Sequence, residues 1–149
     1  MRLAVDVAAE NARSPLSRDD IASAARAVLR YERVRDALLS ITLVDRRTIS
    51  RLNADHLGHR GDTDVISFGF ARATPTDPVI GDIYICPDVA RENAKLNHAR
   101  VRDEIARLVV HGVLHVLGYD HPETPTRDRS KMWRRQERLL RRLGYGVRP

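Results

Sequence analysis

Residues 108–121 read LVVHGVLHVLGYDH, a run that is mostly apolar and yet contains three histidines. From Leu108 to Leu117, every residue other than the histidines is Leu, Val or Gly. A helix that is apolar on all sides is normally buried. The run therefore predicts a buried helix at the centre of the fold, with Gly118 as the residue that turns the chain after it.

The rest of the chain alternates between strand and helix patterns. Four runs predict strands: residues 2–7, 39–43, 64–70 and 79–85. The turn-rich segment ARATPTDP (71–78) joins the last two strands, as in a hairpin. Helices are predicted after the caps Ser17 and Asp45, and over about residues 88–97, 100–117 and 125–143. The polar, glycine-containing run NADHLGHRGDT (53–63) predicts a loop.

This order of elements predicts an α+β fold. We expect a single domain, with a small mixed four-stranded sheet packed with about five helices. The length of 149 residues suits one domain with a proper core.

The composition is that of a soluble globular protein, since 42% of the residues are hydrophobic and 31% are charged. No apolar run approaches the ~20 residues that cross a bilayer. Asp6 and Glu10 interrupt the short apolar stretch at the N-terminus, so no signal peptide is expected. The one cysteine, Cys86, is expected to be a small buried residue, and it suits a reducing cytoplasm.

The positive charge is concentrated toward the C-terminus. Residues 127–149 contain nine Lys or Arg and two acids, whereas residues 1–126 have a net charge of −1. Such a segment attracts phosphate backbones by counterion release. The solvated face of an arginine-rich helix has the same sequence pattern, so charge alone leaves both interpretations open.

The three histidines of the central run are spaced to converge. His111 and His115 are four residues apart and share one helix face, while the turn at Gly118 brings His121 back toward them. Like charges disfavour one another in a dry site, but neutral imidazole is a favoured ligand of zinc and similar metals. Three histidines leave a fourth position open for water, as in catalytic sites. The sequence therefore predicts a metal site at the end of the central helix, formed by His111, His115 and His121.

The spacing H-x3-H-x2-G-x2-H resembles the zinc-binding part of the metzincin peptidases. Those enzymes carry a glutamate general base directly after the first histidine, where this chain has Gly112. Because glycine has no side chain that takes a proton from water, the usual peptidase mechanism is absent.

The run HGVLHVLGYDH (111–121) resembles the signature of the YbeY endoribonuclease family, bacterial factors of rRNA maturation. The segments LNADHLGHRGDTDVISFGF (52–70), GDIYI (81–85) and MWRRQERLL (132–140) resemble, in the same order, its loop-and-strand motif, its next strand and its last helix. The resemblance implies a zinc-dependent hydrolase that cleaves single-stranded RNA, with the three histidines as metal ligands and as catalytic residues.

The resemblance also implies a biological role. That role is 3′-end processing of small-subunit rRNA, together with ribosome maturation and quality control. The implied partners are rRNA and the small ribosomal subunit, a ribosomal protein and an Era-type GTPase. Neither DNA nor a membrane is expected as a partner.

The chain departs from the family pattern in the loop motif. Leu57 stands where the family has an arginine, and Asp62 stands where a proline commonly precedes the Thr-Asp pair. Leucine cannot replace the bidentate phosphate contact of a guanidinium. Arg60, with His59 and His56, is expected to contact the substrate from this loop and to substitute in part.

Four other residues have two interpretations each. Asp120 adjoins the third histidine, and it either orients a ligand histidine within the catalytic site or serves only as a turn residue. Asp82 either faces the cleft or is a hydrogen-bonded acid of a strand. Tyr119 and Trp133 offer stacking surfaces to unpaired bases, but packing in the core is the favoured interpretation of both.

Three functions stay open at this point. The first is a metal-dependent endoribonuclease for rRNA, whose general base is not assigned. The second is a metalloenzyme for another substrate, peptidase included, which Gly112 disfavours. The third is a non-catalytic ribosome-assembly factor that keeps its metal for stability, to which Leu57 gives weight. We expect one zinc ion per chain, although nickel, cobalt and copper also accept three imidazoles.

Overall fold

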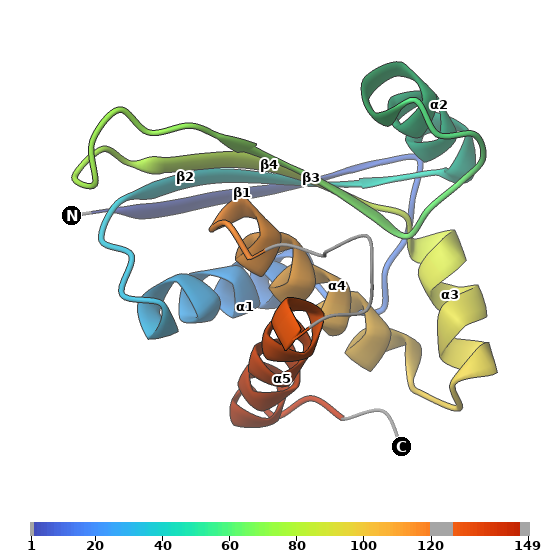
Figure 1. The fold of residues 1–149 in the computed structure, drawn as a ribbon. Coiled ribbons are helices and arrows are strands. Elements are labelled where there is room, and N and C mark those ends of the chain that lie inside the picture. Colours follow the sequence, from blue (N-terminus) through green and yellow to red (C-terminus); the bar gives the residue numbers. More distant parts are fainter. Residues whose placement is uncertain (1, 120–126, 147–149) are drawn as a thin grey trace.

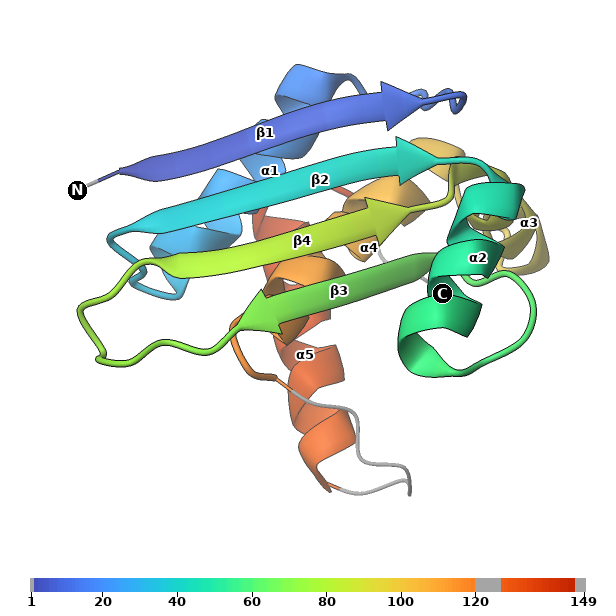
Figure 2. The same cartoon turned by 90° about the horizontal axis from the view of Figure 1, so that it is seen from above.

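The structure is a computed structural model that describes residues 2–119 and 127–146, in which four strands form one mixed sheet (Figures 1 and 2). The strands are β1 (Leu3–Glu10), β2 (Ala37–Val44), β3 (Val65–Phe70) and β4 (Val79–Ile85). Their order in the sheet is β1-β2-β4-β3. β1, β2 and β4 are parallel, and β3 runs antiparallel to β4. The predicted mixed sheet and its hairpin are confirmed.

The described residues contain five helices: α1 (Arg18–Tyr31), α2 (Arg46–Leu57), α3 (Pro87–Leu96), α4 (Val101–Val116) and α5 (Arg127–Arg142). α1 and α4 cover one face of the sheet, and α5 packs against α4 on the side away from the sheet (Figure 1). α2 lies over the opposite face, beside β3, and α3 stands at one end of the sheet (Figures 1 and 2). The predicted single α+β domain is confirmed. None of the described helices combines the length and the apolar character that a membrane crossing requires.

α4 is the predicted central helix, and 11 of its 16 residues are buried. Its apolar side chains belong to the same core as those of β1, β2, β4, α1 and α5. Contacts with α1, α3 and α5 enclose the sides that do not face the sheet. Toward the C-terminal end of α4 this burial becomes partial, and His111 and His115 are half-buried there. The core thus holds the helix rigidly while leaving its histidine end near the surface.

α4 and the sheet approach each other closely at two glycines. A Cβ added to Gly112 would lie 2.9 Å from Cγ2 of Ile83, and one added to Gly81 would lie 2.6 Å from Cγ1 of Val116. Carbon atoms in contact normally stay about 3.5–4.0 Å apart. The absence of a side chain at residue 112 is therefore what allows α4 to pack on β4.

The prediction of a loop over residues 53–63 is wrong for its first five residues. α2 continues to Leu57 and ends at Gly58, whose φ of 68° lies in the left-handed region. Asn53 is buried, and its Nδ2 donates to the carbonyl oxygen of Gly61 at 3.1 Å. Asn53 can therefore lie on the buried side of α2, because the loop after the helix supplies the hydrogen-bond acceptor for its side chain.

The predicted N-caps are confirmed. Oγ of Ser17 accepts a hydrogen bond from the backbone of Asp20 at 3.0 Å at the start of α1. Oδ1 of Asp45 accepts one from the backbone of Thr48 at 2.9 Å at the start of α2. Cys86 is buried before α3, as predicted, and burial raises the pKa of its thiol.

Candidate functional site

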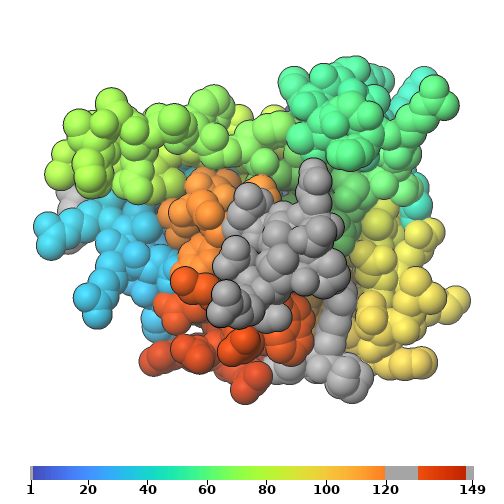
Figure 3. All heavy atoms as spheres, in the orientation of Figure 1, coloured from blue at the N-terminus to red at the C-terminus, as the bar shows by residue number. Residues whose placement is uncertain are grey.

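His111 and His115 lie on one face of α4, close to its C-terminal end. Their ring centroids are 6.3 Å apart, and the ring planes are tilted by 32°. Gly118 follows the helix with a φ of 102°, in the left-handed region that the predicted turn requires. Figure 3 shows this end of α4, in orange, at the molecular surface beside α5. The histidine pair and the turn are therefore placed as the sequence predicts.

The predicted third ligand, His121, and its neighbour Asp120 lie outside the described residues. Among the residues that are described, no three His, Cys, Asp or Glu side chains are grouped to hold a metal ion. The convergence of three histidines thus stays a prediction, and the described part of the site is the pair on α4.

A chain of hydrogen bonds determines which nitrogen of His111 carries the proton. Nδ1 of His111 lies 2.8 Å from Oε1 of Gln136 on α5, and Nε2 of Gln136 donates to Oε2 of Glu137 at 3.2 Å. Because a carboxylate only accepts hydrogen bonds, Glu137 keeps the NH₂ group of Gln136 on its own side. The amide oxygen then faces His111, so Nδ1 donates to it and carries the proton of the neutral ring, which makes Nε2 the unprotonated nitrogen.

Glu137 belongs to a buried cluster of charged side chains. Nε and Nη2 of Arg107 each donate to Glu137 at 3.2 Å, and Nη1 of Arg107 donates to Oε1 of Glu104 at 2.9 Å. Burial by itself lowers the pKa of Arg107, but the hydrogen bonds and charges of Glu137 and Glu104 outweigh it and hold that pKa above its ordinary value. Arg107 therefore stays charged and anchors the carboxylate that orients Gln136.

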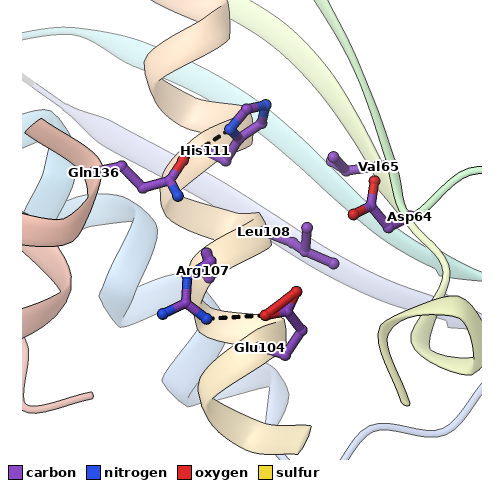
Figure 4. Close-up of a pocket in the computed structure, with 7 residues that line it drawn as sticks. All are labelled: Asp64, Val65, Glu104, Arg107, Leu108, His111 and Gln136. Carbon is purple, nitrogen blue, oxygen red and sulfur yellow. Dashed lines mark hydrogen bonds and ion pairs between the residues drawn. The ribbon is translucent and has the colours of Figure 1, made fainter. Parts of the chain in front are cut away.

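A cavity of about 200 Å³ lies beside His111 (Figure 4). It is lined by Asp64, Val65, Glu104, Arg107, Leu108, His111 and Gln136. Asp64 and Val65 face α4 across the cavity from the start of β3 (Figure 4), and Nδ2 of Asn93 on α3 donates to Oδ2 of Asp64 at 3.2 Å. The cavity thus brings carboxylate, guanidinium, amide and imidazole groups together, as a site for a polar ligand requires.

The residues predicted to contact substrate divide between a helix and a loop. His56 belongs to the last turn of α2, and its ring contacts Phe68 with 5.4 Å between centroids. Phe68 lies on the face of the sheet away from α4, so the structure does not place His56 on the side of the histidine pair. His59 and Arg60 are exposed in the loop after α2, which leads to Asp64 at the cavity. Their contact with substrate stays a prediction.

The structure corrects two further interpretations. Ile83 of β4 faces Gly112 of α4, so its neighbour Asp82 points to the opposite face of the sheet, away from the cavity. The prediction that Trp133 packs in the core is wrong, because this residue is 55% exposed.

The same prediction is confirmed for Tyr119, which packs against the core and donates through its hydroxyl to Oε1 of Glu32 at 2.6 Å. That hydrogen bond raises the pKa of Tyr119.

The histidine pair on α4, His111 and His115, suits a zinc ion. Zinc binds neutral imidazole nitrogens, and the other ring nitrogen of such a ligand usually donates to a fixed acceptor. His111 fits this pattern, since its Nδ1 donates to the amide oxygen of Gln136 and Nε2 is the unprotonated nitrogen of the neutral ring. The identity of the metal stays a prediction.

The sequence profile of the endoribonuclease YbeY family matches residues 6–144. The chain belongs to this family. The YbeY endoribonuclease of Thermobifida fusca is 37% identical in a match that covers 93% of this chain and 92% of the relative. That of Frankia casuarinae is 37% identical, with 93% of this chain and 73% of the relative covered. A Thermotoga maritima protein solved in solution shares the fold, with a TM-score of 0.65, 24% identity, and 93% and 88% of the two chains covered.

The predicted YbeY resemblance is therefore confirmed, but sequence reasoning assigned no role to five residues around His111. They are Asp64, Glu104, Arg107, Gln136 and Glu137. The sequence did indicate that Gln136 is buried, because it shares the helical spacing of Met132 and Leu139 on the apolar side of the last helix. A polar residue on a buried helix face needs a hydrogen-bonding partner, and here that partner is a ligand histidine candidate.

Proposed function

We propose that this member of the YbeY family is a zinc-dependent endoribonuclease that cleaves single-stranded RNA in the 3′-end processing of small-subunit rRNA. The names of the family and of its relatives support the reaction class. The resemblance of the histidine motif supports zinc and the rRNA substrate. The proposed setting is ribosome maturation and quality control in the cytoplasm, with a ribosomal protein and an Era-type GTPase as partners.

In this proposal His111, His115 and His121 hold the metal. Zinc, when bound, polarises a phosphate oxygen, activates a water, or does both. The observation that carries the proposal is the 2.8 Å hydrogen bond between Nδ1 of His111 and Oε1 of Gln136, because it fixes the ring in the tautomer that a metal-binding histidine with an outer acceptor adopts, one turn away from His115. Glu137 and Arg107 keep that hydrogen bond in place.

A peptidase function is disfavoured by the surroundings of Gly112. The metzincin mechanism needs a carboxylate at this position. Even a Cβ there would lie 2.9 Å from Cγ2 of Ile83 and 3.2 Å from Oγ of Ser67. This face of α4 is closed by the sheet, so no general base can act from residue 112.

A second candidate function is a non-catalytic ribosome-assembly factor that keeps its metal for stability. The observation that favours it is Leu57, the last residue of α2, which is 47% exposed where the family has an arginine. A leucine cannot bind a phosphate as a guanidinium does. In the catalytic alternative, His59 and Arg60 of the neighbouring loop must supply that contact.

A cleavage assay on a precursor small-subunit rRNA tests the two functions. The wild-type chain, His115→Ala and Leu57→Arg are compared, with the zinc content of each preparation measured. We expect the wild type to cleave, and His115→Ala to lose both bound zinc and cleavage. Leu57→Arg is expected to cleave at least as fast as the wild type.

Two results would redirect the proposal. If the zinc-loaded wild type does not cleave and Leu57→Arg does, the assembly factor is the better description of the natural chain. If the wild type cleaves at the same rate after complete removal of metal, zinc dependence is wrong.

A further inference from the structure

Trp133 is the single tryptophan of the chain, and 55% of its side chain is exposed. Most other large apolar side chains of α5 are buried. Trp133 lies one turn before Gln136 and Glu137, on the same side of the helix, because residues three and four apart are neighbours. A large exposed ring thus flanks the residues that hold His111.

Another part of the α5 surface, which includes Arg134 directly after Trp133, is positively charged. We define the basic face of α5 as five exposed cations: Lys131, Arg134, Arg138, Arg141 and Arg142. At 3.6 residues per turn these positions fall within an arc of about 100°, whose nearer edge lies about 80° round the helix from Trp133. Glu137 does not offset their charge, since it is buried against Arg107. Arg46 and Arg91, which are half-buried elsewhere on the molecule, are paired with nearby acids. Within the basic face, the guanidinium of Arg142 stacks over the ring of Tyr31 at 4.8 Å.

We propose that Trp133 and the basic face of α5 bind single-stranded RNA, with an unpaired base stacked on the indole and the flanking phosphates at the cations. This rests on the proposed function, which makes RNA the substrate. Aromatic platforms beside cationic grooves bind single strands with little sequence preference, because every base has a π-face. Trp133 lies one turn from Gln136, which is hydrogen-bonded to His111, so a strand whose base stacks on the indole passes close to the histidine pair.

The surface also explains selectivity for unpaired RNA. In a duplex the bases are stacked on one another and paired, so none is available to cover the indole of Trp133. The cations attract both forms through their phosphates. Discrimination therefore comes from the tryptophan, while the basic face contributes affinity that decreases with salt.

Intrinsic fluorescence tests the base-stacking part, since Trp133 is the sole tryptophan. His115→Ala is titrated with a single-stranded oligoribonucleotide of about 12 nucleotides, a length typical of such binding sites, whose 2′-O-methyl groups prevent cleavage. We expect the RNA to quench the fluorescence. In the same background, Trp133→Leu is expected to bind labelled RNA about 5- to 150-fold more weakly. Phe70→Leu is the control, because Phe70 on β3 is equally exposed, at 56%, and its loss should leave affinity unchanged.

The salt dependence of binding tests the basic face. Replacing Arg134, Arg138 and Arg141 together with glutamine is expected to reduce the slope of log affinity against log salt by about 2. The matched triple variant replaces three exposed arginines on other parts of the chain: Arg2, Arg18 and Arg47. It is expected to keep the wild-type slope.

Four results would overturn this proposal: binding without quenching, equal affinity of Trp133→Leu, equal affinity for a duplex of the same length, or no binding at all. Each is distinguishable from a failure of the proposed function. Binding is measured in His115→Ala with an RNA that cannot be cleaved, so neither metal nor activity enters the result, whereas the proposed function is decided by cleavage and zinc content.

Discussion

The proton on His111 is positioned by residues that do not touch the histidine. Gln136 alone would not decide the matter, because an amide turned by 180° offers a donor in place of an acceptor. Glu137 removes that choice, and Arg107 holds Glu137 between the helices. The neutral amide also adds no further charge beside the two glutamates of the cluster. The direction of these hydrogen bonds therefore determines which ring nitrogen of His111 carries the proton.

Gln136→Met tests this control of His111. Methionine fills a similar volume but cannot accept a strong hydrogen bond, so the proton of His111 is no longer held on Nδ1. We expect the affinity for zinc to fall about 10- to 100-fold, the usual effect of losing a partner of a metal-bound histidine. Competition with a chromogenic chelator measures it. Leu139→Met, on the same buried side of α5, should keep the wild-type affinity, and equal affinities of Gln136→Met and the wild type would refute the role of Gln136.

Gly112→Ala tests the contact between α4 and the sheet. The new methyl group meets Cγ2 of Ile83 at 2.9 Å, and overpacking of this kind costs about 1–3 kcal/mol. Because alanine favours a helix over glycine by about 1 kcal/mol, we expect the free energy of unfolding to fall by no more than about 2 kcal/mol in urea denaturation. Ile83→Ala should relieve the clash, so the double variant should lose less than the two single losses combined. Additive losses would contradict the proposed contact.

At the level of elements, α2 shows how far sequence patterns reach. Asp45 acts through its own backbone neighbourhood, so the N-cap is readable from the sequence, whereas the C-terminal cap at Gly58 was assigned to a loop. Residues 53–57 carry no apolar stripe, and a prediction based on burial therefore assigns them to a loop. The helix continues because Asn53 bonds to the carbonyl of Gly61, and the path of the loop that supplies this carbonyl is not encoded in any local pattern.

The cap of α2 makes part of the stability pH-dependent. Hydrogen bonds from the backbone of Thr48 and the side chain of Asn11 hold the pKa of Asp45 below its ordinary value. A carboxyl group with a depressed folded pKa stabilises the fold above its unfolded pKa, about 3.9, and loses that contribution as the pH falls through the folded pKa.

We therefore expect Asp45→Ala to be less stable than the wild type at neutral pH, and the difference to shrink as the pH falls below about 4. Urea unfolding at a neutral and an acidic pH measures it. Asp45→Asn keeps a capping oxygen and should stay close to the wild type at neutral pH. A difference for Asp45→Ala that is the same at both pH values would show that ionisation of Asp45 does not matter.

The candidate site was predictable where one element contains it. His111 and His115 share a helix, so their spacing determines their relation. Gln136 is 25 residues from His111, and apolar periodicity indicates only that it faces inward, not what it meets. Trp133 shows the opposite error: its residue type suggested burial, but it lies beside the apolar stripe of α5 and is exposed. Contacts between elements depend on packing that no single periodicity specifies.

In the whole molecule, the core is independent of the histidines. Buried side chains of β1, β2, β4, α1, α4 and α5 form one continuous cluster, while His111 and His115 lie half-buried at its edge. A chain of 149 residues buries enough surface to fold without a metal. Metal binding should therefore add to the stability of a structure that already exists.

Thermal unfolding with and without zinc tests this relation. A ligand that binds only the folded state adds about 2.7 kcal/mol when its free concentration is a hundred times Kd. For a chain of this size that corresponds to a rise in Tm of about 5–10 °C. We expect the metal-free protein to unfold in one cooperative transition, and zinc to raise its Tm by this amount. His115→Ala should unfold near the metal-free wild type and show little response to zinc. A metal-free chain without a cooperative transition would mean that the ion is needed for folding, and equal shifts in both proteins would place the bound zinc away from His115.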